Sequence, residues 1–446
     1  MLLRRSPFNR VSVIGLGYIG LPTAAILAAS GAEVVGVDIS ERAVNAVNAG
    51  RIHIVEPGLE PLVKSEVDSG RLRAVLSPEP ADAFIITVPT PLTESEPGLI
   101  PEPDASYIQA AADAIAPVLK AGNLIILEST SPVGTTEQLA RWLKSARPDL
   151  SFPGCGDDAR PDIHIAYCPE RVLPGHVLKE LVRNDRIIGG CTPECSAAAG
   201  ALYQRFVSGA CIVTDARTAE LTKLTENAFR DVNIAFANEM ALVCDQLGID
   251  VWELIRLANR HPRVNILNPG PGVGGHCIAV DPWFIAHGAP DQARLITQAR
   301  RVNDARPGYV VEQALHAAGS RENPVIACLG LAFKPDIDDL RESPALQVAT
   351  RLAQQSKCRV LAVEPNIGAL PAPLAAADVE LVPLDAALKE ANVVVVLVDH
   401  REFLQIDPDA LSGKSIIDTR GLLPRLRAPL VTAQHVDDKQ PVEDSV

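Results

Sequence analysis

One cysteine of this chain stands in a setting that suits covalent chemistry. Four glycines precede it in the segment PGPGVGGHCIAVDP, at Gly270, Gly272, Gly274 and Gly275. Such a loop can bring backbone N–H groups close to a ligand, and Asp281 follows Cys277 after a short spacing. A thiolate can add to an aldehyde and form an adduct from which a second hydride leaves. An isolated cysteine is more often a small buried apolar residue, but the glycine-rich loop favours the catalytic interpretation here.

A long predicted helix carries a second group of polar side chains. Lys223, Asn227 and Arg230 stand at positions i, i+4 and i+7 and therefore share one face of that helix. A solvated polar stripe is one interpretation of the pattern. A lysine paired with an asparagine is also what an alkoxide or oxyanion needs for stabilisation.

The amino-terminal turn has the sequence GLGYIG. Gly15 permits a tight turn, Gly17 lets a pyrophosphate approach the backbone, and Gly20 lets the following helix pack closely on the strand. The N-terminus of that helix then presents its dipole and its N–H groups to the phosphates. These glycines alone could mark a tight turn in another kind of α/β protein.

The elements around this turn complete a βαβ unit. A β-rich run at Val11–Ile14 precedes an alanine-rich helix expected from Leu21 to Ser30, which Gly31 ends as a C-cap would. A second strand at Glu33–Val37 then leads to Asp38. A carboxylate at this place would hold the adenosine ribose hydroxyls and repel a 2′-phosphate, so NAD is favoured over NADP.

Strands and helices alternate along much of the remaining chain. Further strands are expected at 83–88, 123–127 and 164–167, and again at 325–329, 360–363, 393–398 and 415–417. Between these two series, residues 215–248 show the apolar spacing of one long helix. The pattern predicts an α/β protein with two Rossmann-like, doubly wound parallel sheets joined by a central helical region.

We expect three domains and a tail. They are an NAD-binding domain (1–210), a central helical dimerisation domain with the cysteine loop (211–318), a carboxy-terminal sugar-nucleotide domain (319–433) and a polar tail (434–446).

The composition excludes several functional classes. The formal net charge of −14 argues against nucleic acid or an anionic membrane surface as the main partner. The start of the chain lacks a signal-peptide core, and the most apolar run, Val393–Val398, is too short to cross a bilayer. We expect a cytoplasmic protein whose nine cysteines are mostly reduced. Cys191 and Cys195 form the closest pair, but no second pair stands at zinc spacing, so no metal is expected.

With these motifs the chain resembles the UDP-glucose/GDP-mannose dehydrogenase family from Val11 to about Leu423, most nearly its UDP-N-acetyl-D-mannosamine dehydrogenase branch. Eight blocks match in the correct order: VSVIGLGYIGLP, VPTP, ESTSPVGTT, YCPERVLPG, LTKLTENAFRDVNIAFANE, HPRVN, GPGVGGHCIAVDP and GLAFKPDIDDLRESP. The resemblance implies a four-electron oxidation that uses two NAD and no metal.

The resemblance also implies roles for the catalytic candidates. Cys277 matches the nucleophile, which forms a thiohemiacetal and then a thioester. Lys223 matches the lysine that stabilises oxyanions, with Asn227 beside it. Thr130 and Asp281 match residues that hold the hydrolytic water and assist proton transfer.

A further acid and two sets of binding residues follow from the same resemblance. Glu170 matches a glutamate near the reacting carbon, although the second acid of the UDP-glucose branch is replaced here by Pro174. Contacts to the sugar nucleotide are matched by Arg171, Val172, Lys223, Asn227, Arg230, His261, Arg263, Gly274, Phe333, Lys334 and Arg420. The cofactor site is matched by Tyr18, Ile19, Arg42, Thr90, Thr130 and Arg341, beside Gly15, Gly17, Gly20 and Asp38. Family members form dimers through the long central helix, with Arg263 commonly supplied across the interface.

The choice of sugar depends on fewer residues. Enzymes of the UDP-glucose branch carry a lysine before the aspartate of the cysteine loop, where this chain has Val280. We expect UDP-N-acetyl-D-mannosamine, oxidised to its uronate for a surface polysaccharide. UDP-N-acetylglucosamine is the close competitor, because a few contacts to one stereocentre discriminate by only about 1–3 kcal/mol. UDP-glucose and GDP-mannose are further alternatives and rank below these two substrates.

Two alternatives come from other classes. A non-catalytic sugar-nucleotide-binding protein would have no need for Cys277, Lys223, Asn227 and Asp281 together. A two-electron 3-hydroxyacid dehydrogenase also joins a Rossmann domain to helices and uses a lysine and an asparagine, but it needs neither Cys277 nor the residues after 324.

Overall fold

The computed structural model describes residues 7–93, 98–154, 161–173, 175–275, 277–319, 321–355 and 358–427. The expected tail at 434–446 and Pro174 lie outside these ranges. The chain falls into two compact units, Met1–Arg230 with Val280–Thr297, and Asp231–Ala279 with Gln298–Val446. Each unit is described by itself.

The first unit is built on an eight-stranded sheet with the order β3-β2-β1-β4-β5-β6-β7-β8. Its strands are β1 (Arg10–Ile14), β2 (Glu33–Val37), β3 (Leu72–Val75), β4 (Ala83–Ile86), β5 (Leu124–Leu127), β6 (His164–Tyr167), β7 (Arg186–Gly190) and β8 (Cys211–Asp215). The pairs are parallel except β6 with β7, which is antiparallel. The central strands are buried along their whole length, as is typical of strands covered on both faces.

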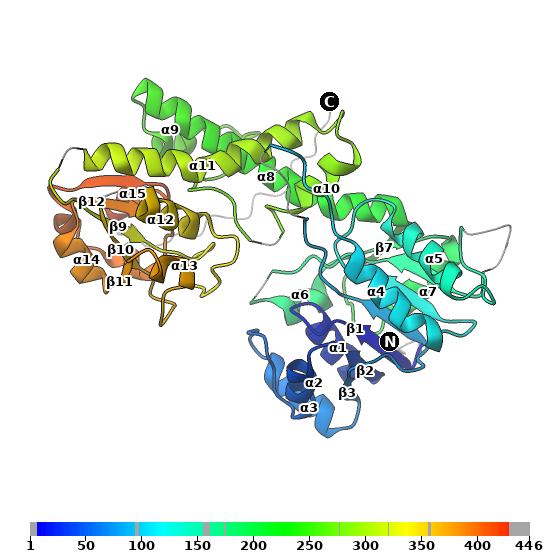
Figure 1. Ribbon diagram of the computed structural model, residues 1–446. Helices are drawn as coiled ribbons and strands as arrows, with labels where there is room; N and C mark the ends of the chain where they lie inside the picture. The colour runs from blue at the N-terminus through cyan, green and yellow to red at the C-terminus, as the bar shows by residue number, and fades with distance from the viewer. Residues whose placement is uncertain are drawn as a thin grey trace. The chain divides into compact units, whose positions relative to one another are not determined.

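Helices cover both faces of this sheet (Figure 1). One apolar core contains residues of α1 (Gly20–Ala29), α3 (Leu59–Asp68) and α7 (Pro193–Tyr203). The core on the opposite face contains residues of α4 (Ser106–Ile115) and α5 (Thr135–Ala146). The shorter helices of this unit are α2 (Glu41–Asn48), η1 (Ala116–Val118), α6 (Val177–Arg183) and α10 (Asp281–Gly288).

Two long helices begin in the first unit and end in the second. They are α8 (Ala216–Leu247) and α11 (Arg294–Ala318), and α11 contains Pro307 in its interior. The shorter α9 (Val251–Ala258) follows α8, and the Asp250 carboxylate caps it by accepting the Trp252 N–H.

The second unit has a five-stranded parallel sheet with the order β11-β10-β9-β12-β13. Its strands are β9 (Val325–Leu329), β10 (Arg359–Val363), β11 (Glu380–Leu381), β12 (Val393–Val396) and β13 (Ser415–Asp418). Residues of α11, α12 (Pro344–Gln355) and α13 (Ala372–Ala375) pack on one face. The other face is covered by α14 (Leu384–Glu390), η2 (Arg401–Gln405), η3 (Pro408–Leu411) and α15 (Leu422–Arg427).

The predicted fold class, two Rossmann-like sheets separated by long central helices, is confirmed. Strand β7 and its antiparallel pairing with β6 were not predicted, because the run RIIGG ends in two glycines and has no apolar alternation. The edge strand β8, whose residues are mostly exposed, was not predicted either. Within the ranges that the structure describes, no helix is both long and apolar enough to cross a membrane.

Candidate active site

The GLGYIG turn has the geometry that its glycines predict. Gly15 has φ +93°, and a Cβ there would lie 2.8 Å from the Thr87 carbonyl oxygen. A Cβ on Gly20 would lie only 1.8 Å from the Gly15 carbonyl oxygen. At Gly17, by contrast, a Cβ would meet no atom within 4 Å. The turn therefore leaves open space at the one position where a pyrophosphate must approach the backbone.

Asp38 lies at the carboxyl end of β2 and is fixed by backbone donors. Its two carboxylate oxygens accept hydrogen bonds from the Leu16 N–H (2.9 Å) and the Ser40 N–H (2.8 Å). A carboxylate has about four lone-pair sites, so two hydroxyl donors of a ribose can still be accommodated. The turn and this carboxylate fit a bound dinucleotide.

The remaining cofactor candidates are placed less closely together. Thr90 donates a hydrogen bond to the Thr130 carbonyl oxygen (2.6 Å), so these two residues meet at the carboxyl edge of the sheet. Tyr18 and Arg42 are exposed and Ile19 is half-buried. Arg341 belongs to the second unit, where its guanidinium binds both carboxylate oxygens of Asp339.

Lys223, Asn227 and Asp281 converge within the first unit. The Asn227 amide donates to Asp281 Oδ2 at 2.5 Å, and Lys223 Nζ lies 3.9 Å from the same oxygen. Asp281 is only 2% exposed. Burial raises the pKa of its carboxyl to about 6, although the Lys223 charge and the Asn227 hydrogen bond act in the opposite direction. Arg230 lies farther along α8 and is exposed.

Glu170 is held by two donors at the end of β6. Arg186 Nη1 donates to Glu170 Oε2 at 2.7 Å, and the Arg171 N–H donates to Oε1 at 2.6 Å. The Arg171 side chain pairs with Glu226 (2.8 Å), and the adjacent Val172 is half-buried. These two hydrogen bonds fix the Glu170 carboxylate in position, although Glu170 lies in the loop that follows β6.

The glycine-rich loop packs tightly against the carboxy-terminal sheet domain within the second unit. A Cβ on Gly274 would lie 2.3 Å from the Glu342 carbonyl oxygen, and one on Gly275 would lie 3.1 Å from the Phe333 ring. A Cβ on Gly270 would lie 3.1 Å from the Arg420 guanidinium. A small cavity of about 30 Å³ opens here, lined in part by Phe333 and Arg420. Three predicted substrate residues, Gly274, Phe333 and Arg420, therefore meet.

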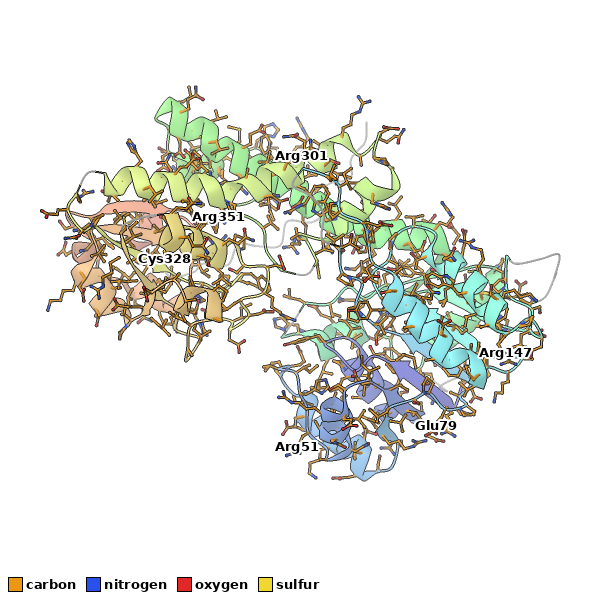
Figure 2. The ribbon with its side chains drawn as sticks, viewed as in Figure 1. Arg51, Glu79, Arg147, Arg301, Cys328 and Arg351 are labelled. Carbon is orange, nitrogen blue, oxygen red and sulfur yellow. The ribbon has the colours of Figure 1, made fainter. Side chains whose placement is uncertain are left out.

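Cys277 differs from the buried thiols in its surroundings. Of the cysteines that the structure describes, Cys277 alone is exposed, and none forms a disulfide. Cys328, labelled in Figure 2 within the five-stranded sheet, is fully buried on β9. Burial raises the pKa of the Cys328 thiol to about 12, which makes it a packing residue and not a nucleophile.

The other substrate candidates of the second unit are Lys334, His261 and Arg263, all exposed. The Arg263 N–H donates to His261 Nδ1 at 3.3 Å. In neither unit do the described residues bring three or more His, Cys, Asp or Glu side chains together as a group that could hold a metal ion.

Several residues that support these groups were not predicted from the sequence. Glu128, which follows β5, accepts a hydrogen bond from Tyr203 (2.5 Å) and lies near Arg186. Asp399 follows β12 and binds the Arg420 guanidinium at 2.8 Å. An acidic residue directly after a buried strand of a parallel sheet is a usable signal, because ligands bind at that edge.

The chain matches three models of one family in order along its length. They are the NAD binding domain (residues 9–207), the central domain (217–305) and the UDP binding domain (327–425) of the UDP-glucose/GDP-mannose dehydrogenase family.

Named relatives and solved structures agree with this match. An NDP-N-acetyl-D-galactosaminuronic acid dehydrogenase from Ralstonia nicotianae is 62% identical over 93% of this chain and 96% of its own length. A UDP-N-acetyl-D-mannosamine dehydrogenase from Escherichia coli is 57% identical over 93% and 99%. The structure of a UDP-D-ManNAc dehydrogenase from Pyrococcus horikoshii superposes with a TM-score of 0.81 at 38% identity, over 93% of this chain and 96% of that one. The chain therefore belongs to the UDP-glucose/GDP-mannose dehydrogenase family and is an NAD-dependent nucleotide-sugar dehydrogenase.

Proposed function

We propose that this enzyme oxidises the C6 alcohol of a UDP-N-acetylhexosamine to the carboxylate, with UDP-N-acetyl-D-mannosamine as the preferred substrate. The observation that carries the proposal is the convergence of Lys223 and Asn227 on the buried Asp281, together with an exposed cysteine on the glycine-rich loop. A two-electron dehydrogenase needs no such cysteine, whereas oxidation to an acid requires a covalent or hydrated aldehyde.

The cofactor is held by the residues of the amino-terminal turn. Gly15, Gly17 and Gly20 give the pyrophosphate its approach, and Asp38 takes the ribose hydroxyls. Bound NAD supplies the hydride acceptor for both oxidations. Tyr18, Ile19, Arg42, Thr90, Thr130 and Arg341 complete the proposed cofactor contacts.

Cys277 acts as the nucleophile in this proposal. Its thiolate adds to the C6 aldehyde carbon and forms a thiohemiacetal, which the second oxidation converts into a thioester. Water then cleaves the carbon–sulfur bond of the thioester, which releases the carboxylate and restores the thiol. Lys223 and Asn227 stabilise the negative oxygen that develops at each addition.

The acidic residues accept and transfer protons in this proposal. Glu170 accepts the proton of the C6 hydroxyl, and Asp281 with Thr130 assists the hydrolytic water. A buried carboxyl whose pKa lies at about 6 is ionised at neutral pH yet remains a competent proton acceptor.

In this proposal, basic side chains offset the negative charge of the diphosphate, and an aromatic side chain stacks on the nucleotide. The proposed contacts are Arg171, Val172, Lys223, Asn227, Arg230, His261, Arg263, Gly274, Phe333, Lys334 and Arg420. The match to the family's UDP binding domain supports UDP as the carrier. Relatives named for N-acetyl-D-galactosaminuronic acid, at 62% identity, add the galacto epimer to the sugars that must be compared.

The proposal extends to the assembly, the domain bounds and the place of action. We infer a homodimer formed through α8, which carries several exposed apolar side chains. The division into 1–210, 211–318 and 319–433 assigns cofactor binding, dimerisation and UDP binding to successive parts of the chain. We infer that the enzyme acts in the cytoplasm, where its proposed ligands, NAD and nucleotide-activated sugars, are found.

The test measures NADH formed per sugar by the purified enzyme. UDP-N-acetylmannosamine, UDP-N-acetylglucosamine, UDP-N-acetylgalactosamine, UDP-glucose and GDP-mannose are compared in parallel. We expect two NADH per sugar and the highest kcat/KM with the mannosamine. One NADH per sugar would mean that oxidation stops at the aldehyde, which contradicts the role of Cys277.

A variant separates the covalent step from cofactor binding. Cys277→Ser should lose nearly all turnover because a hydroxyl is a far poorer nucleophile than a thiolate at neutral pH. NAD affinity, measured by fluorescence titration, should not change. Full steady-state activity in Cys277→Ser would refute the covalent scheme.

A further inference from the structure

Two buried glutamates of the first unit share one arginine. Arg186 Nη1 donates to Glu170 Oε2 at 2.7 Å and lies 3.8 Å from Glu128 Oε1. All three side chains are at least nine-tenths buried. Tyr203 donates its phenolic O–H to Glu128 at 2.5 Å, and its ring lies 4.8 Å below the Arg186 guanidinium. The other Glu128 oxygen, Oε2, is buried without a hydrogen-bond partner.

The antiparallel strand explains why these residues meet. The register of β6 with β7 pairs Tyr167 with Gly189. Continued by three residues, the same register brings Glu170 opposite Arg186. Glu128 follows β5, which is the other neighbour of β6. A parallel β7 would place Arg186 at the opposite edge of the sheet, away from both carboxylates.

We propose that Glu128 is a positioning residue that couples to Glu170 through Arg186, so that the two carboxyls act as one base for the substrate hydroxyl. This inference rests on the proposed function, in which Glu170 accepts the C6 hydroxyl proton. When the C6 O–H bond breaks, its proton is taken up by the pair and its electrons form the carbonyl as the hydride leaves. One cation faces two carboxylates, so the doubly ionised pair is incompletely neutralised and binds a proton readily.

The charges around Glu128 support this arrangement. Burial raises the pKa of the Glu128 carboxyl to about 7; Arg186 and the Tyr203 hydrogen bond oppose the rise and Glu170 adds to it. The thiols of Cys168 and Cys211 also lie near Arg186. Burial raises the pKa of both thiols, that of Cys168 far above the ordinary value, so both are neutral. A lone carboxylate paired with Arg186 would be a much weaker base.

Two variants should shift the pH profile of kcat/KM in opposite directions. Glu128→Gln leaves Arg186 to Glu170 alone, so the acidic limb should move to lower pH by about one unit or more, and kcat on the plateau should fall. Tyr203→Phe removes the hydrogen bond that stabilises ionised Glu128, so the acidic limb should move to higher pH. Loss of packing alone would not move the limb in opposite directions.

The matched control is Glu66→Gln, which replaces a buried glutamate whose partner is Arg71. Its pH profile should coincide with that of the wild type, and thermal melts should verify that each variant is folded. An acidic limb that stays in place in Glu128→Gln and Tyr203→Phe, or moves the same way in both, overturns the coupling. Should Glu128→Gln fail to fold, the direction of the Tyr203→Phe shift decides. Failure of the proposed function is distinct, since the wild type would then form no NADH with any sugar nucleotide.

Discussion

At the scale of single residues, the ionisation of Asp281 links the candidate site to stability. The Asp281 carboxyl has an ordinary pKa of 3.8 and a pKa of about 6 in the fold, because its buried ionised form is poorly solvated. The favourable contribution of the neutral form is fully present below pH 3.8 and is lost as pH rises through about 6. Two pKa units correspond to about 3 kcal/mol of unfolding free energy.

Asp281→Asn should remove this pH dependence, because an amide carries no charge to bury. Urea unfolding of the variant and the wild type, measured at a series of pH values, gives the difference in unfolding free energy. That difference should change in favour of the variant by about 2–3 kcal/mol between pH 4 and pH 7. A difference that stays constant over this interval would contradict the prediction.

Residue types and spacing were sufficient to predict part of the candidate site. Lys223 and Asn227 share a helix face, and the structure shows both against Asp281. Glu128, Arg186 and Tyr203 could not be predicted in this way, since their contacts join positions tens of residues apart. These contacts depend on the register of β6 with β7 and on the packing of α7, which carries Tyr203. Local spacing contains no information about that register.

At the scale of elements, the GLGYIG turn offers two glycines with opposite roles. Gly17→Ala should fold normally, because its Cβ would meet no atom within 4 Å, yet it should lower NAD affinity by about tenfold or more by filling the approach to the pyrophosphate. Gly20→Ala should lower stability by about 1–3 kcal/mol, because its Cβ would collide with the Gly15 carbonyl oxygen. Thermal melts and NAD titrations measure both. Equal loss of stability in the two variants would contradict this division.

In the loop after β9, as in the amino-terminal turn, backbone N–H groups donate to a carboxylate that follows the neighbouring strand. Leu331 and Ala332 donate their N–H groups to Glu364 Oε2 (2.8 and 3.1 Å), much as Leu16 donates to Asp38. His400 Nε2 lies 2.9 Å from the same Glu364 oxygen, and His400 Nδ1 accepts the Asp336 N–H at 2.9 Å. Burial opposes ionisation of Glu364, but these hydrogen bonds lower its pKa to about 2. The pair thus holds both ends of the loop that carries Phe333 and Lys334.

His400→Ala should therefore raise KM for the nucleotide sugar while kcat and NAD affinity change little. It removes one hydrogen bond from the buried Glu364, which keeps its backbone donors Leu331 and Ala332, and it leaves the Asp336 N–H without its acceptor; together these losses should cost about 1–3 kcal/mol of stability. Steady-state kinetics and chemical unfolding test both effects. His316→Ala, an exposed histidine of the same unit, is the control and should behave as the wild type. An unchanged KM in a folded His400→Ala would separate this loop from substrate binding.

The elements themselves were predictable where burial leaves a regular pattern. The predicted strands at Glu33–Val37, His164–Tyr167 and Val325–Leu329 have the observed bounds. Gly31 has φ +91° after α1, as a C-cap glycine requires. The edge strand β8 has the short apolar run Cys211–Val213, but Ile212 and Val213 are exposed and the run shows no alternation of apolar and polar residues. An edge strand pairs through its backbone and need not bury its side chains.

At the scale of the whole molecule, the proposed dimer depends on the surface of α8. Among the exposed large apolar residues of this helix, four lie in its second half and are 39–68% exposed: Phe229, Phe236, Val243 and Leu247. Their spacings of seven, seven and four residues place them along one side of the helix. An exposed apolar stripe of this kind supports the proposed interface with a second copy of the chain.

Phe236→Lys should convert the proposed dimer into a monomer, because a buried unpaired ammonium at an interface is strongly unfavourable. Sedimentation velocity gives the mass of each species, and Leu404→Lys, an isolated exposed leucine of η2, is the matched control that should remain dimeric. Since Arg263 is proposed to act across the interface, the monomer should lose turnover while it keeps its affinity for NAD. A dimeric Phe236→Lys would move the interface away from α8, and a fully active monomer would show that Arg263 acts within its own chain.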